Sequence, residues 1–156
     1  MKTLLSFLFL FFTICGYAQS EKLFTVDREL SNSNINQIYQ AKNGVIWIAT
    51  EDGLNRYDGA KFSAYKHEEG KNCSLVDNNV RAIFEDSKGH FLIGTQRGLQ
   101  LYDPATELFK EIPILYQTGI NMNAHISIIV ERKNGDILIG TAGHGIYSLR
   151  LDETEA

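Results

Sequence analysis

The chain has 156 residues, of which 44% are hydrophobic and 22% charged, and its formal net charge is -4. This length predicts a single domain, and this composition is that of a soluble globular chain rather than a disordered or membrane protein. The net negative charge and the scattered Lys and Arg residues exclude a sequence-independent nucleic-acid surface, because such a surface needs clustered basic side chains.

The first residues have the features of an export signal. Lys2 gives a positive start, residues 4–15 form an apolar core, and Gly16 and Ala18 place small side chains where a signal peptidase cuts. This core is too short for a membrane-spanning helix, which needs about 20 residues. We therefore expect residues 1–18 to be a signal peptide and the mature chain to be exported to the periplasm.

The two cysteines add little to this prediction. Cys15 is the alternative site of a lipoprotein anchor, although the bulky Ile14 precedes it. Cleavage after Ala18 leaves Cys73 alone, so no disulfide framework is expected. Residues 72–74, NCS, match the N-glycosylation pattern, but a match of three residues is weak.

Residues 19–30 contain the segment KLFTVDREL, which predicts an outer strand that leads into the first of three similar units. The stretch GVIWIATEDGLNRYDG at 44–59 returns as GHFLIGTQRGLQLYDP at 89–104 and as GDILIGTAGHGIYSL at 135–149. The spacing is 45 residues (89 − 44) and then 46 residues (135 − 89). A repeat of this length is typical of a propeller blade and too long for leucine-rich, ankyrin or tetratricopeptide units.

Each unit contains the same succession of local signals. A strand is followed by a Gly-containing hairpin turn, an apolar strand that ends in Thr, a second turn, and two further strands. The second strand is apolar on both faces, since Ile46 and Ile48 alternate with Trp47 and Ala49, so both faces must be covered by other sheets. The repeated structural positions are Gly44, Trp47, Thr50, Gly53, Tyr57, Gly89, Thr95, Gly98, Tyr102, Gly135 and Thr141.

These patterns predict an all-β fold, a β-propeller of about three four-stranded antiparallel blades in an incomplete ring. The first blade is expected at 31–70, the second at 71–117 and a partial third at 118–156. The small residue before each Thr, which is Ala49, Gly94 or Gly140, is expected to let neighbouring backbones approach closely. No segment has a sustained apolar period of 3.6 residues, so little or no helix is expected.

The pattern GxIWIATEDGLNRYDG resembles the two-component regulator propeller repeat, and LIGTQRGLQLYD resembles the repeat that follows it in that family. The resemblance covers about Leu23 to Leu149. One departure is that Leu92 and Leu138 occupy the position equivalent to Trp47, where repeats of the family usually have Trp. Proteins of this family carry such repeats in the exported sensor region of hybrid two-component histidine kinases.

The resemblance also implies a parent protein, its partners and a class of ligand. The chain would be the amino-terminal fragment of a larger sensor, and its partners would be the remaining blades and the kinase of a parent protein anchored in the inner membrane. The ligand implied is an oligosaccharide, detected to regulate polysaccharide-utilisation genes, and the parent is implied to act as a homodimer. Because three blades leave two sheet faces uncovered, the isolated chain is expected to be marginally stable, oligomeric or prone to aggregation.

Three residues are candidate ligand contacts. His144 lies between two glycines in the inserted turn of the third unit, where an exposed loop often carries binding residues. Arg56 and Arg97 are further candidates, although Arg56 has carboxylates beside it with which to pair. His90, just after a turn, is expected at the surface.

No catalytic constellation, metal-ligand spacing or cofactor motif is present in the sequence, so we expect no cofactor, no metal and no enzymatic activity in this chain. Two alternatives stay open. One is an exported propeller enzyme, a polysaccharide lyase or hydrolase, and the other is a stand-alone binding or scaffold propeller that is completed by oligomerisation.

Overall fold

The computed structural model describes residues 22–25, 29–115 and 123–151, and the predicted signal peptide at 1–18 lies outside them. The described residues form strands and loops, with no helix long and apolar enough to cross a membrane. The strands are β1 (Ile35–Gln40), β2 (Ile46–Thr50), β3 (Gly53–Tyr57), β4 (Phe62–Tyr65), β5 (Val80–Glu85), β6 (Phe91–Thr95), β7 (Leu99–Asp103), β8 (Leu108–Ile112), β9 (Ile126–Glu131), β10 (Ile137–Thr141) and β11 (Gly145–Leu149).

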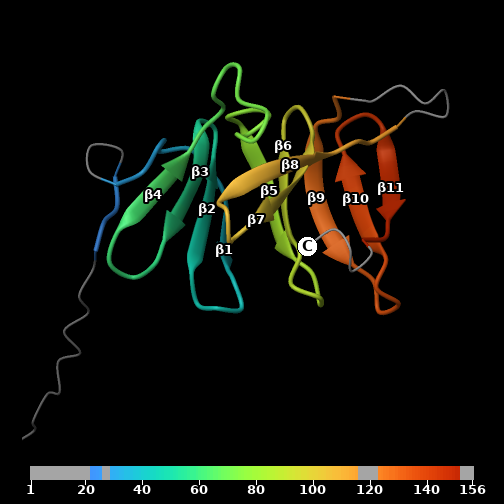
Figure 1. The fold of residues 1–156 in the computed structure, drawn as a ribbon, viewed down its shortest axis with the longest axis horizontal. Coiled ribbons are helices and arrows are strands. Elements are labelled where there is room, and N and C mark those ends of the chain that lie inside the picture. The colour runs from blue at the N-terminus through green and yellow to red at the C-terminus, as the bar shows by residue number, and fades with distance from the viewer. Residues whose placement is uncertain (1–21, 26–28, 116–122, 152–156) are drawn as a thin grey trace, which may run out of the picture.

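The strands form three antiparallel sheets that stand side by side (Figure 1). The first two sheets are four-stranded meanders, β1-β2-β3-β4 and β5-β6-β7-β8, and the third contains β9-β10-β11 within the described residues. Neighbouring sheets lie closest at their first strands, where β1 and β2 contact β5, and β5 and β6 contact β9. The all-β prediction of propeller blades is therefore confirmed, with β1, β5 and β9 as the inner strands.

The expected leading strand at 19–30 is not formed in the part of it that the structure describes, residues 22–25 and 29–30. Its described residues do not pair with β1 or β4, the two edge strands of the first sheet. Phe24 instead packs on β3 and β4, with its ring centroid 5.5 Å from that of Tyr57 and 5.1 Å from that of Phe62. The segment therefore covers part of the outer face of the first blade.

The first hairpin of each blade turns at a glycine. Gly44, Gly89 and Gly135 have φ angles of 86°, 93° and 84°, in the left-handed region that residues with a side chain seldom adopt. The predicted turns are therefore present in all three blades at equivalent positions.

The repeated threonines close the second hairpin. The hydroxyls of Thr50, Thr95 and Thr141 donate to the carbonyls of Gly53, Gly98 and Gly145 at 2.8, 3.0 and 2.8 Å. The residue after each Thr also donates its N–H to the linker before the same blade, for example Gln96 to Asn79 at 2.9 Å. In each blade the Thr side chain thus holds the second hairpin turn, and the N–H of the next residue holds the linker that leads into the blade.

Replacing Thr95 with Val is expected to lower the free energy of unfolding by about 0.5–1.5 kcal/mol, because the hydrogen bond from the fully buried Thr95 hydroxyl to the carbonyl of Gly98 is lost, while that carbonyl keeps the backbone N–H of residue 95 as a donor. Urea denaturation followed by tryptophan fluorescence measures the loss. Thr95→Ser retains the hydroxyl and should retain most of the stability. Thr141→Val, at the more exposed copy, should cost less; equal losses at Thr95 and Thr141 would contradict the role given to burial.

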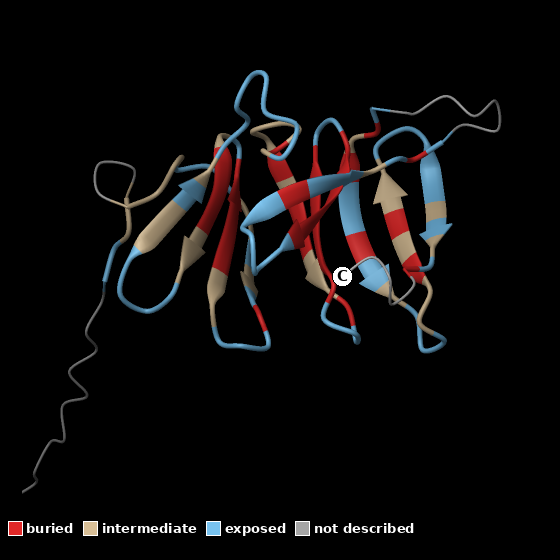
Figure 2. Ribbon diagram, viewed as in Figure 1, coloured by how far each residue is buried: buried red, intermediate tan, exposed pale blue. Residues whose placement is uncertain are grey.

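Two apolar cores fill the spaces between the sheets, as the buried segments in Figure 2 show. Trp47, 4% exposed, and Leu54, 0% exposed, lie between the first and second blades, and Leu92 and Leu99, both 0% exposed, lie between the second and third. Both faces of the β6 strand are buried throughout. The prediction that sheets apolar on both sides are sandwiched by their neighbours is confirmed at this blade.

The small residue in β6 permits the closest approach between blades. A Cβ atom on Gly94 would lie 2.5 Å from the Cγ2 atom of Ile126 on β9 of the next blade. At the equivalent Gly140, the group that a Cβ atom would meet is Ile128 of the same sheet, at 2.6 Å. The expected close approach of neighbouring blades is therefore seen at Gly94, while Gly140 relieves crowding within its own sheet.

The two outward-facing blade surfaces retain exposed apolar side chains in the described residues. Ile38 on the first blade is 66% exposed, and Ile128 and Ile146 on the third are 57% and 74% exposed. Leu54 and Leu99 occupy the same register position as Ile146 but are fully buried, because a neighbouring blade covers them. The exposure of Ile146 therefore marks a blade face that no described residue covers.

Candidate functional site

The structure does not bring the three predicted ligand contacts together. Arg97 lies in the β6–β7 turn and His144 in the β10–β11 turn, both exposed and at the same end of the sheets. Arg56 lies toward the opposite end of β3, where its guanidinium is 4.0 Å from the carboxylate of Asp58. Arg56 also lines a small cavity of about 90 Å³ with Trp47 and Tyr102. A single site containing all three residues is therefore excluded by the topology.

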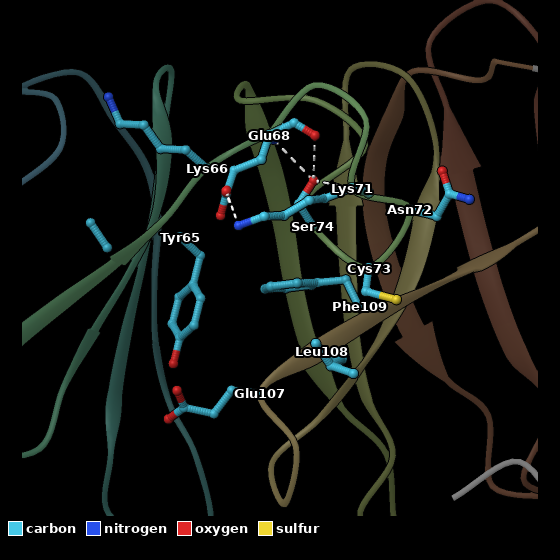
Figure 3. A pocket seen from close by; sticks show the side chains of 11 residues that line it. Tyr65, Lys66, Glu68, Lys71, Asn72, Cys73, Ser74, Glu107, Leu108 and Phe109 are labelled. Carbon is cyan, nitrogen blue, oxygen red and sulfur yellow. Dashed lines mark hydrogen bonds and ion pairs between the residues drawn. The ribbon is translucent and has the colours of Figure 1, made fainter.

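A larger cavity lies at the outer rim of the first two blades, where the sheets diverge. This rim cleft has a volume of about 340 Å³ and is bounded by β4, β8 and the linker between the blades. Its lining residues are labelled in Figure 3: Tyr65, Lys66, Glu68, Lys71, Asn72, Cys73, Ser74, Glu107, Leu108 and Phe109.

Aromatic rings form the inner wall of the rim cleft. Tyr65 and Phe109 are in edge contact, with ring centroids 5.5 Å apart and planes at 72°. The Tyr65 hydroxyl lies 3.2 Å from that of Tyr102 in the core behind it, and burial raises the pKa of both hydroxyls. Both groups therefore stay neutral at physiological pH, and the aromatic wall is held in one position by packing and a hydrogen bond.

Charged side chains form the outer walls of the cleft. The Lys66 ammonium lies 2.6 Å from the carboxylate of Asp52, and Lys71 pairs with Glu68 on the upper side of the view in Figure 3. All of these side chains are substantially exposed, so their ion pairs can exchange for contacts with a polar ligand.

Glu107, on the wall opposite the linker, has an unusual backbone. Its φ of 57° is the only positive value at a non-glycine residue among those described. The turn before it is held by Asp103, whose carboxylate accepts from the Thr106 hydroxyl at 2.6 Å and from the Ala105 N–H at 2.9 Å, and these bonds hold the pKa of Asp103 below its usual value. Such backbone outliers concentrate at functional sites, which favours the cleft as a binding site.

The linker that forms one wall of the rim cleft is held by a buried amide. Gln100, 1% exposed, accepts from the N–H of Val76 at 2.9 Å and donates to the carbonyl of Ser74 at 3.0 Å. Asn55, at the same position of the first blade, accepts from the N–H of Ser31 at 2.9 Å. The cleft wall is therefore fastened by a contact that is repeated between blades.

A second cavity of about 430 Å³ lies on the other side of β8 and shares Cys73, Leu108 and Phe109 with the rim cleft. His90 lines it, and the expectation that this residue lies at the surface is wrong: it is 5% exposed. The buried Asp86, 3% exposed, lies 2.7 Å from its Nδ1 atom and explains this position, because a polar ring enters a core only with a partner.

The described residues contain no group of three or more His, Cys, Asp or Glu side chains able to hold a metal ion. The rim cleft was not predicted from the sequence. Its available signal was the long, polar linker at residues 66–79, between β4 and β5.

Two stretches of the chain match the two-component regulator propeller family, residues 29–52 and 74–97. These stretches are offset by 45 residues (74 − 29) and contain the first two strands of the first and second blades. The resemblance to this family predicted from the repeated motifs is therefore confirmed.

Similar proteins and similar solved structures agree with this family match. Histidine kinase P4 of Formosa agariphila is 38% identical over 72 residues, which are 44% of this chain and 5% of the kinase. The extracellular domain of a putative hybrid two-component system of B. thetaiotaomicron is 27% identical, with a TM-score of 0.73, over 83% of this chain and 19% of that one. The extracellular domain of a putative one-component system of the same organism is 29% identical, with a TM-score of 0.65, over 83% and 17%. The chain thus spans a small part of each.

Proposed function

We propose that this chain, whose first two blades carry two-component regulator propeller repeats, belongs to the exported sensory region of a hybrid two-component histidine kinase and binds oligosaccharides in the rim cleft. The observation that carries the proposal is the agreement between the family match and the resemblance to extracellular domains of two-component systems. The chain itself would be a binding module without catalytic activity.

The chemistry of the rim cleft supports a saccharide ligand. Sugars present apolar C–H faces beside hydroxyl groups, and sites for small ligands combine aromatic walls with a few polar groups that fix orientation. Tyr65 and Phe109 offer the aromatic wall, and Lys66, Asn72 and Glu107 offer donors and acceptors around it.

The proposed route of signalling involves the parent protein. Residues 1–18 would direct export, the parent would be anchored in the inner membrane as a homodimer, and ligand binding would change the relative orientation of its two exported regions. A ligand can shift such an equilibrium only by its difference in affinity for the two arrangements. The readout would be transcription of polysaccharide-utilisation genes.

Binding to the full chain is tested by calorimetry with a panel of neutral and acidic oligosaccharides. Lys66→Ala and Glu107→Gly are each expected to weaken binding of the best ligand by about tenfold or more, since each removes a charged hydrogen-bonding group. Glycine at position 107 accepts the φ of 57°, so this variant removes the carboxylate without adding backbone strain.

Lys133→Ala, which removes an exposed lysine from the third blade, is the matched control and should bind like the unaltered chain. Unchanged affinity in both cleft variants would show that the rim cleft is not the site. Steady release of shorter or unsaturated sugars during the titration would instead favour the alternative of an exported enzyme.

A further inference from the structure

Side chains of the first blade cover the free edge of β5, the inner strand of the second blade. The Gln37 carboxamide accepts from the N–H of Ile83 at 2.7 Å and donates to its carbonyl at 3.1 Å. Asn36 donates to the carbonyl of Val80 at 2.7 Å. These contacts satisfy main-chain groups on the edge of β5 that does not pair with β6.

The same cover is missing at the next inner strand, β9. The positions of Asn36 and Gln37 are taken in the second blade by Arg81 and Ala82, and a methyl group cannot form the bonds of a carboxamide. Ile129 pairs with Ile139 as Ile83 pairs with Ile93, so its N–H and carbonyl point toward the same free edge. Within the described residues, no side chain bonds Ile129 as Gln37 bonds Ile83.

A cavity of about 240 Å³ lies at this uncovered edge. Residues of all three inner strands line this inner-edge cavity, among them Asn36, Gln37, Arg81, Ala82, Ser127 and Ile129. The substitution of Ala for Gln in the repeat therefore leaves both unused main-chain hydrogen-bonding groups and the space in front of them.

Arg81 brings a positive charge to the inner-edge cavity. One terminal nitrogen donates to the Oδ1 atom of Asn36 at 3.1 Å, and no carboxylate of the described residues forms an ion pair with the guanidinium. Its Nε atom is the one buried side-chain nitrogen or oxygen of the described chain without a hydrogen-bond partner. A buried donor left without an acceptor is costly, and a guanidinium fork matches a carboxylate in both geometry and charge.

We propose that the inner-edge cavity binds the carboxylate of an acidic saccharide, with Arg81 and the N–H of Ile129 as donors. The carboxylate follows from the guanidinium, which has no ion-pair partner among the described residues, and from the free main-chain donor, and the saccharide rests on the proposed function. The Ser127 hydroxyl on β9 and the Oδ1 atom of Asn36 on β1, both of residues that line the cavity, contact neighbouring hydroxyl groups of the sugar.

The probe is a galacturonic acid trisaccharide, added to the full ¹⁵N-labelled chain and compared with the neutral galactose trisaccharide. We expect the acidic sugar to shift the Nε–H resonance of Arg81 and the amide resonance of Ile129, and the neutral sugar to leave both in place. Arg81→Gln should weaken binding of the acidic sugar by about tenfold or more. Lys61→Ala, which removes an exposed lysine from the β3–β4 turn, should not.

A second variant fills the cavity from within the chain. Ala82→Gln is expected to place a carboxamide on Ile129 as Gln37 does on Ile83, which abolishes binding of the acidic sugar. Because Ala82 is only 3% exposed, circular dichroism in urea verifies that this variant is folded before binding is measured. If Arg81→Gln binds the acidic sugar as the unaltered chain does, the site is wrong.

Other outcomes separate this site from the proposed function. Neutral sugars that shift rim-cleft resonances such as that of Asn72, with Arg81 unmoved by the acidic sugar, would overturn the carboxylate site and leave saccharide sensing intact. Equal shifts of Arg81 with acetyl-dialanine, a peptide carboxylate, would overturn the assignment to a saccharide.

Discussion

Replacing Trp47 with Ala is expected to lower the free energy of unfolding by about 3–5 kcal/mol, the range observed when a large buried aromatic side chain is truncated. Trp47 is 4% exposed, and its ring centroid lies 4.8 Å from that of Phe91 and 5.0 Å from that of Tyr102 on the second blade. It also stacks on Tyr65, at 5.9 Å, so the loss of its ring removes support from the rim cleft as well.

Circular dichroism in urea measures this change, because the variant lacks the tryptophan needed for fluorescence. The matched controls are Leu92→Ala and Leu138→Ala, at the same position of the second and third blades. Leu92 is fully buried and Leu138 only half-buried, so the first control should lose clearly more stability than the second. A similar loss at both positions would contradict the assignment of this position to packing between blades.

Gly94→Ala is expected to destabilise the chain by about 1–3 kcal/mol, the range for an extra methyl group forced into a filled core. The new Cβ atom would meet Ile126 of the next blade, with its Cγ2 atom at 2.5 Å and its Cβ atom at 2.8 Å. The blades must therefore separate, or Ile126 must leave its position. Urea denaturation at equilibrium measures the loss.

A double-mutant cycle isolates the contact. Ile126→Ala creates space at the point of collision, so Gly94→Ala should cost much less in that background than in the unaltered chain. Gly98→Ala is the control for adding a methyl group elsewhere, since its Cβ atom would meet only Val76, at 3.6 Å, an ordinary contact distance. Strict additivity of Gly94→Ala and Ile126→Ala would rule out the collision as the cause.

The sequence was sufficient to predict the blades because the determinants of a blade are local and recur. Gly44 and its two counterparts mark turns whose φ angles require them, and Thr50 and its counterparts mark hairpins that their hydroxyls close. The alternation of apolar residues on both faces of the second strand then implies neighbours on both sides, which the buried β6 strand bears out.

The sites could not be predicted in the same way, because they depend on departures from the repeat. The buried position of His90 requires Asp86, and this pair has no equivalent in the first blade, where Ala41 and Val45 stand. The rim cleft is formed by side chains of two sheets and a linker, whose distances no periodic pattern records. The inner-edge cavity follows from an Ala in place of a Gln, which becomes informative only once the bonds of Gln37 are known.

The third blade carries one residue more than the others between its Thr and its glycine, yet Ile139 faces Tyr147 as Ile93 faces Gln100. The addition is absorbed in the turn, where Gly143 and Gly145 have φ angles of 94° and 79°. Hairpins at this end can therefore lengthen without a register slip, which would turn every side chain of the strand to the opposite face. Natural variation in length, and engineered insertions of an epitope or a fluorophore, are best tolerated beside His144.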